Sequence, residues 1–212
     1  MKFVLNILKA FLINFLFIGI INAATICPSI SPKLAGDGPT EQVEAIINDV
    51  VCAFIGLHNQ NNGTLTSTLN LTKKKIIPYI DLEHSTELAL GNHWASLTKQ
   101  QKKIFERDIK NSLINDYVSI LAEIKEWEEL NVLVDQNYSQ NANIARVKIM
   151  VSLDNSNARA TVVLKLINKN RWKIYDLEYQ SVSILDIEKI GYDSKIKRQG
   201  IEKLIQKMLS KS

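Results

Sequence analysis

The sequence predicts an α+β fold in which amphipathic helices pack against a curved antiparallel sheet. Apolar residues recur at helical spacing over about 39–128, alternate as in strands over about 132–185, and return to helical spacing over about 186–210. Separate blocks of helix and strand are typical of α+β proteins. The connections between the predicted strands are short, which favours an antiparallel meander of about four strands. We expect a cone-like body with an apolar pocket.

Length and charge place limits on the class of protein. The chain has 212 residues, which suits a single domain, here expected over 24–212. Its 26 basic and 22 acidic residues give a formal charge of +4. Proteins that bind nucleic acid usually carry a concentrated basic face, so we expect no nucleic-acid partner.

The first 23 residues have the pattern of a secretory signal peptide. A positively charged start that includes Lys9 precedes an apolar run over 10–21, and small residues follow up to Ala23. The alternative is an uncleaved anchor, because 3–21 would nearly span a bilayer, although polar residues interrupt it. We expect cleavage after Ala23 and export of the chain.

The two cysteines, Cys27 and Cys52, leave two interpretations open. In an oxidising compartment they would form a disulfide between the N-terminal tail and the first helix. Such a loop contributes about 3 kcal/mol in the chain-entropy model. The alternative is two free, partly buried thiols, because spacing alone does not decide a pairing.

The helical part contains two well-marked helices. The first begins near Pro39, has a dense apolar face over 43–55, and is expected to stop at Gly56. The second begins after Thr98, which with Gln101 forms a capping-box pattern. Its wide apolar stripe needs a cover, and its members up to residue 121 are Ile104, Phe105, Ile109, Leu113, Ile114, Tyr117, Ile120 and Leu121.

The strand part alternates cleanly in its central hairpin. On the first strand, 144–153, residues Val147, Ile149 and Val151 fall on one face. A turn over 154–157 leads to the return strand, 159–167, where Val162 and Leu164 share a face. The next strand covers 171–179, and 182–185 extends or follows it.

No catalytic or metal-binding constellation emerges from the remaining polar residues. His84 and His93 are nine residues apart and lack a metal-ligand pattern, so we expect no metal site and no cofactor. Asp176 lies on a predicted strand, where it is either a general base or a structural acid bonded to backbone amides or an arginine. The lysine-rich C-terminal end is either a solvated face or a docking surface for anionic lipid or an acidic partner.

Two groups of residues resemble the MlaC family of periplasmic phospholipid carriers, also called toluene-tolerance proteins. The first group is Tyr79-Ile80-Asp81, Leu90-Gly91-Asn92-His93-Trp94, Leu97-Thr98, Gln101, Phe105, Leu113 and Tyr117. The second group is Trp172-Lys173-Ile174-Tyr175-Asp176, Val182-Ser183-Ile184-Leu185, Gly200, Leu204-Ile205 and Leu209. The chain departs from the family pattern at Ser181, where the family usually has glycine.

The resemblance implies a periplasmic protein of a Gram-negative bacterium and no enzyme. It implies a carrier of glycerophospholipids between an outer-membrane lipoprotein complex and an inner-membrane ABC transporter with an MCE-domain subunit. Such transport maintains the lipid asymmetry of the outer membrane. Each acyl methylene removed from water contributes about 0.8 kcal/mol, so two acyl chains can drive binding without a clamp on the head group.

The expected lipid contacts come from both halves of the domain. From the helix we expect Phe105, Ile109, Leu113 and Tyr117, and from the sheet Val147, Ile149, Val151, Val162 and Leu164. The resemblance adds Val182 and Ile184. The competing classes are an exported enzyme on a cone-shaped sheet with Asp176 as its general base, and an adaptor that binds only protein through the basic C-terminal face.

Overall fold

The computed structural model describes residues 38–124, 127–153 and 159–210, and these follow the predicted order of helices, sheet and helices. The predicted signal peptide (1–23), Cys27 and the predicted turn at 154–157 lie outside the described residues. The disulfide between Cys27 and Cys52 therefore stays a prediction.

The helical elements that precede the sheet are α2 (Pro39–Asn59), α3 (Leu65–Lys75), η1 (Ile77–Tyr79), α4 (Leu82–Leu90), η2 (Gly91–Ser96), α5 (Lys99–Glu123) and η3 (Trp127–Glu129). The strands are β1 (Leu130–Val134), β2 (Ser139–Asn141), β3 (Ile144–Leu153), β4 (Arg159–Asn168), β5 (Trp172–Tyr179) and β6 (Val182–Ser183). The helices after the sheet are α6 (Ile184–Gln199) and α7 (Ile201–Leu209).

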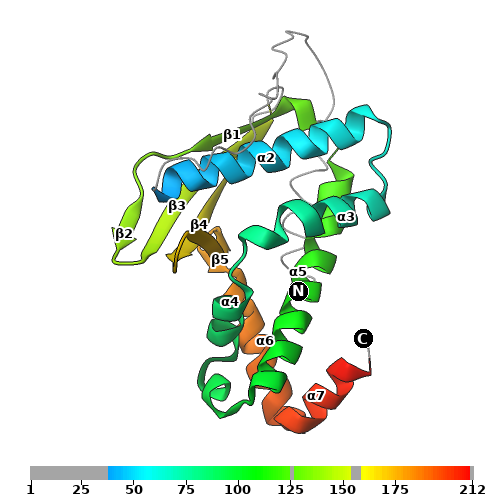
Figure 1. The fold of residues 1–212 in the computed structure, drawn as a ribbon, viewed down its shortest axis with the longest axis vertical. Coiled ribbons are helices and arrows are strands. Elements are labelled where there is room, and N and C mark those ends of the chain that lie inside the picture. Colours follow the sequence, from blue (N-terminus) through cyan, green and yellow to red (C-terminus); the bar gives the residue numbers. More distant parts are fainter. Residues whose placement is uncertain (1–37, 125–126, 154–158, 211–212) are drawn as a thin grey trace.

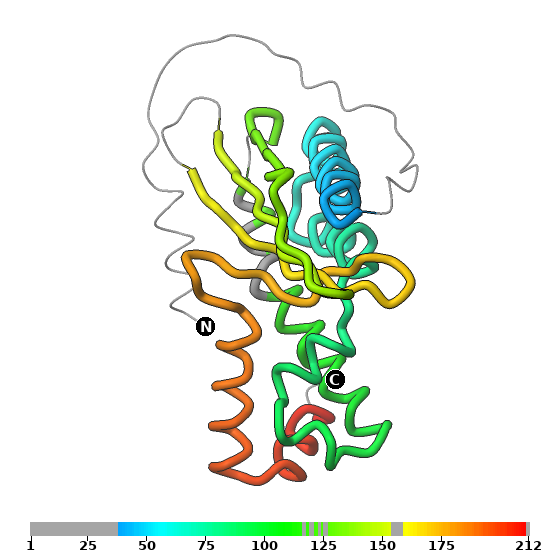
Figure 2. Tube along the Cα trace, turned by 90° about the vertical axis from the view of Figure 1, so that its left-hand side faces the viewer, coloured from blue at the N-terminus to red at the C-terminus, as the bar shows by residue number. Residues whose placement is uncertain are grey.

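The sheet is antiparallel throughout its named pairs and has the order β1-β3-β4-β5-β6, with β2 also paired to β3. Its strands curve, as Figure 2 shows. This confirms the predicted fold class of helices packed on a curved antiparallel sheet. The sheet has six strands rather than about four, because β2 and β6 are only three and two residues long and leave no alternating pattern.

The predicted start of α5 is confirmed in atomic detail. The Thr98 backbone N–H donates to Gln101 Oε1 at 2.9 Å, and the Gln101 N–H donates to Thr98 Oγ1 at 3.2 Å. This reciprocal pair is a capping box, which satisfies amide groups that the first helical turn leaves without partners.

Two predicted boundaries are wrong. Helix α2 continues through Gly56 to Asn59, because burial of Phe54 and Ile55 outweighs the roughly 1 kcal/mol that glycine costs inside a helix. The strand expected at 182–185 ends at Ser183, whose Oγ accepts the Asp186 N–H at 3.1 Å and starts α6.

The fold divides into two regions along its longest axis (Figure 1). At one end α2 runs across one face of the sheet, and Figure 2 shows it beside the curved strands. At the other end α4, α6 and α7 surround the first part of α5. We call these regions the sheet–α2 layer and the helical end. An isolated parallel bridge, Ile80 to Ile174, joins the segment before α4 to β5.

Candidate functional site

The predicted sheet residues share one apolar face. The register pairs Val147 with Leu164 and Ile149 with Val162, and it places Val151 on the same side of β3. Val147 and Leu164 are buried, whereas Val151 and Val162 are partly exposed. The hairpin therefore presents a continuous aliphatic surface that the protein covers only in part.

Helix α2 supplies the cover. Val43 is fully buried against the sheet, and Ile47 packs beside it. The buried members of the sheet–α2 layer are Val43, Ala145, Val147, Ile149, Leu164, Leu166 and Trp172. The partly buried members are Ile47, Val132, Val134, Val151, Val162, Ile174 and Leu177. Half of this layer thus keeps contact with solvent.

A second cluster, which we call the Trp127 cluster, lies further along α2. Its buried members are Phe54, Ile55 and Trp127, and Val50 and Leu130 pack against them. The Phe54 and Trp127 rings stack with centroids 4.4 Å apart and an interplanar angle of 8°. The α2 side chains in these two clusters are missing from the predicted site, although the dense apolar face over 43–55 marks them in the sequence.

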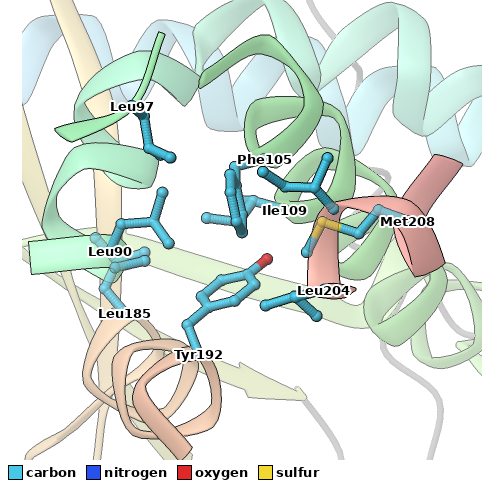
Figure 3. Close-up of a cluster of buried hydrophobic side chains, with 10 residues drawn as sticks. Leu90, Leu97, Phe105, Ile109, Leu185, Tyr192, Leu204 and Met208 are labelled. Carbon is cyan, nitrogen blue, oxygen red and sulfur yellow. The ribbon is translucent and has the colours of Figure 1, made fainter. Parts of the chain in front are cut away.

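The structure places Phe105, Ile109 and Leu113 in a different cluster from the predicted sheet residues. Phe105 and Ile109 are fully buried, and Leu113 packs beside them, in a cluster formed with α4, α6 and α7. Figure 3 shows the labelled side chains of this cluster, among them Phe105, Ile109, Leu204 and Met208. The apolar stripe of α5 is covered here by other helices of the chain. The side chain of Tyr117 lies outside the described part of the structure.

Polar contacts close the helical end further. The Tyr192 hydroxyl donates to Asp108 Oδ2 at 2.9 Å, linking α6 to α5. Burial, together with the nearby Asp108 carboxylate, raises the pKa of Tyr192 far above its ordinary value. The phenol therefore stays protonated and serves as a hydrogen-bond donor.

The two predicted residues at the edge of the sheet lie at the start of α6. Val182 is 49% exposed on β6, and Ile184 is the partly buried first residue of α6. The turn before them places Gln180 and Ser181 at φ values of 49° and 64°. This left-handed conformation explains why a glycine suits the position of Ser181.

Asp176 holds structural hydrogen bonds. Its carboxylate accepts from Ser183 Oγ and Lys165 Nζ, each at 2.7 Å, and from the backbone N–H groups of Leu177 and Leu185 at 2.8 and 3.2 Å. Burial favours the neutral form of Lys165, but the hydrogen bond and charge of Asp176 outweigh it and raise the pKa of Lys165. Both oxygens of the carboxylate are thus engaged in holding β4, β5 and α6 together.

An open depression of ≈ 670 Å³ lies between η1, the start of α4 and the β4–β5 turn. Its mixed lining consists of Ile77, Pro78, Ile80, Asp81, Leu82, Glu83, Lys169, Asn170, Arg171 and Lys173. Burial raises the pKa of Asp81, but the His84 backbone N–H and Lys169 outweigh that effect and leave the pKa lowered. This surface mixes apolar and charged side chains, whereas the sheet–α2 layer is built from apolar side chains.

Histidine and cysteine side chains form no metal centre in the described ranges. There, no group of three or more His, Cys, Asp or Glu side chains is placed to hold a metal ion. His84 Nδ1 lies 3.6 Å from Glu87 Oε2, and His93 Nε2 lies 3.4 Å from Asp193 Oδ1. Across the same residues, no helix combines the length and apolar character needed to cross a bilayer.

The fold and its interior define an α+β protein with an incompletely closed apolar layer between a curved sheet and one helix. The family model described as "MlaC protein" matches residues 48–210. This match covers most of the chain, so the chain belongs to the MlaC protein family.

Two proteins, one from Haemophilus and one from Ralstonia, illustrate what the chain is similar to. The intermembrane phospholipid transport system binding protein MlaC of Haemophilus influenzae is 22% identical over 141 residues, which are 65% of this chain and 65% of that protein. A phospholipid-binding protein of Ralstonia solanacearum, solved in complex with a phospholipid, has a TM-score of 0.64 and 24% identity. That likeness covers 79% of this chain and 93% of the solved chain, and it shows a shared fold.

Proposed function

We propose that this protein binds phospholipid with the acyl chains in the sheet–α2 layer. The observation that carries the proposal is the row of partly exposed aliphatic side chains, which include Ile47 on α2 and Val151 and Val162 on the sheet. The similar proteins from Haemophilus and Ralstonia, described as a phospholipid transport binding protein and a phospholipid-binding protein, support it.

The energetics of this layer suit a lipid carrier. Each methylene moved from water into an apolar site contributes about 0.8 kcal/mol, so two long acyl chains bind firmly without specific polar contacts. Firm binding also makes release slow. Transfer then requires a partner that binds the open state better than the closed one.

We further propose that the protein is exported to the periplasm after cleavage of residues 1–23. There it would shuttle glycerophospholipids between an outer-membrane lipoprotein complex and an inner-membrane ABC transporter with an MCE-domain subunit. Membership of the family supports this role, which would maintain the lipid asymmetry of the outer membrane. The role is tested by transfer of labelled lipid between vesicles that carry the two complexes.

Lipid binding is tested by paired substitutions on the two faces of β3. Val151→Asp places a carboxylate on the apolar face, where burying a charge is unfavourable, and should lower the loaded lipid at least tenfold. Met150→Asp adds the same charge one residue away on the opposite face, where Met150 is 42% exposed, and should leave loading unchanged. Loading is measured by solvent extraction of the purified proteins followed by lipid mass spectrometry.

The amount of loaded lipid is divided by the folded fraction of each variant, which circular dichroism measures. Equal loading in the two variants would place the lipid away from this face. Failure to recover any phospholipid from the wild-type protein, or to load it from vesicles, would overturn the proposed function itself.

A further inference from the structure

Four buried polar atoms have no hydrogen-bond partner among the described residues. They are His58 Nε2, Thr68 Oγ1, Thr72 Oγ1 and Trp127 Nε1. The side chains of Thr68, Thr72 and Trp127 belong to residues that are only 0%, 3% and 3% exposed. A buried polar group without a partner costs folding free energy, so such groups usually have a bonding role.

His58 and Trp127 lie together at one end of α2, and α3, which carries the two threonines, packs against the same cluster through Leu71. The His58 ring lies 6.4 Å from the Trp127 ring, which stacks on Phe54. Thr68 and Thr72 are one turn apart on α3, on either side of Leu71, which packs against the Trp127 cluster. Figure 1 shows α3 beside the C-terminal end of α2.

The two threonines differ from the usual buried helical threonine. In α4, Thr86 Oγ1 donates to the Leu82 carbonyl at 2.6 Å, which satisfies its hydroxyl within the helix. Thr68 and Thr72 make no such bond. Their hydroxyl groups are therefore buried hydrogen-bond donors without a partner among the described residues, and a carbonyl oxygen is the kind of group that would satisfy them.

The loop after α2 holds the His58 ring close to this region. A Cβ at Gly63 would lie 2.8 Å from His58 Cε1, so glycine allows the ring to lie against the loop. The neighbouring residues 59–62 are exposed. This end of the layer therefore borders solvent, as a site for the polar part of a lipid requires.

The dimensions fit an acyl chain that starts here. From His58 back to Val43, α2 advances by about 22 Å at 1.5 Å per residue. One leaflet of a bilayer contributes about half of the ~30 Å hydrocarbon core, or roughly 15 Å. An acyl chain that begins at the four polar atoms can thus lie along α2 within the sheet–α2 layer.

The chemistry of the four groups favours a neutral hydrogen-bond acceptor. The indole N–H and both hydroxyl groups can donate, as can His58 when Nε2 carries the proton. The buried side chains around them are hydrophobic. A phosphate brought here would lose its hydration without a compensating cation, whereas an ester carbonyl needs only such donors.

We propose that Thr68, Thr72, His58 and Trp127 bind the acyl ester carbonyls of a glycerophospholipid whose chains lie in the sheet–α2 layer. This inference rests on the proposed function and adds a polar recognition site to it. The lipid head group would then lie at the exposed loop 59–62, and the ends of the acyl chains would lie near Val43.

The test compares an ester lipid with its ether analogue, which lacks the carbonyl oxygens. Diacyl phosphatidylglycerol and dialkyl phosphatidylglycerol of equal chain length compete with a fluorescent lipid for the purified protein. The wild type should bind the ester lipid about tenfold more tightly, a difference of about 1.4 kcal/mol. The double variant Thr68→Val, Thr72→Val should bind both lipids equally, at the level of the ether lipid.

The valine variants should stay folded, so a change in lipid preference reports on the missing hydroxyl groups. Valine matches threonine in shape, and removal of unpartnered hydroxyl groups should not lower stability. Thr86→Val, which removes a satisfied hydroxyl at the helical end, is the matched control and should keep the preference for the ester.

Three outcomes overturn the inference. Equal binding of ester and ether lipids by the wild type would show that buried water alone satisfies these atoms. An unchanged ester preference in the double variant would place the carbonyls elsewhere. Binding of neither lipid by the wild type would overturn the proposed function together with this inference.

Discussion

The helical end and the sheet–α2 layer are both built from aliphatic and aromatic side chains, yet they are closed to different degrees. At the helical end, Phe105 and Ile109 are fully buried, and Tyr192 is 1% exposed. In the sheet–α2 layer, Val151 and Val162 remain partly exposed although they lie on the same face of the sheet as buried side chains. The first region has its apolar surface covered by its own chain, whereas the second leaves surface for another molecule.

This difference shows that a wide apolar stripe on a helix does not by itself identify a ligand-binding surface. The stripe of α5 is the most conspicuous in the sequence, and α4, α6 and α7 cover its first half. Helix α2 is a single cover on a broad curved sheet. A single helix about 10 Å wide cannot span several strands at a spacing of about 4.8 Å each, so part of the sheet stays open.

The largest expected effect on stability comes from replacing a buried phenylalanine by alanine in each of the two regions. Phe105→Ala and Phe54→Ala each remove a fully buried ring and should lower the free energy of unfolding by about 3–5 kcal/mol. Only Phe54→Ala should also lower lipid loading per folded molecule, because Phe54 belongs to the Trp127 cluster. Denaturant unfolding and lipid extraction measure the two effects. Equal loss of loading in both variants would break the distinction between the regions.

A smaller effect is expected at the joint between the regions. Asp176→Asn removes the negative charge that pairs with Lys165. The same carboxylate accepts hydrogen bonds from two backbone N–H groups. The substitution should cost about 1–3 kcal/mol of stability and leave lipid loading per folded molecule intact.

Asp135→Asn is the control for this joint, because the Asp135 carboxylate lies 3.7 Å from exposed Lys148. It should change stability by no more than about 0.5 kcal/mol. Equal stability of the two variants in urea unfolding would contradict a structural role for Asp176.

The smallest effect is a gain in stability at the turn between β5 and β6. Ser181 has a φ of 64°, which a side chain makes unfavourable, so Ser181→Gly should stabilise the protein by about 1 kcal/mol. The urea midpoint should rise, with lipid loading unchanged. Ser181→Ala, which keeps a Cβ, should give no gain, and a lower midpoint for the glycine variant would show that the serine side chain matters more than the backbone.

Local patterns predicted much of the fold. The capping box at Thr98 and the alternation over 144–153 depend on neighbours within a few residues, and the structure confirms both. The end of α2 and the start of α6 were less predictable. At Gly56 tertiary burial overrides helix propensity, and at Ser183 an N-cap converts an apparent strand into a helix.

The candidate site was predicted only in part. Strand alternation correctly grouped Val147, Ile149, Val151, Val162 and Leu164 on one face. It gave no information on which helix covers that face, because an amphipathic helix marks its apolar side without naming its partner. The four buried polar atoms carry no sequence signal, since threonine, histidine and tryptophan become unusual only when burial leaves them without partners.

By itself the sequence determined the succession of helices and strands, the apolar face of each, and the resemblance to a lipid-carrier family. These features follow from residue periodicity, capping and spacing, which are local. The tertiary structure alone decided that α5 closes the helical end while α2 covers the sheet incompletely. That choice depends on how surfaces far apart in the chain share the burial of apolar area, and such competition is settled only when all of them pack together.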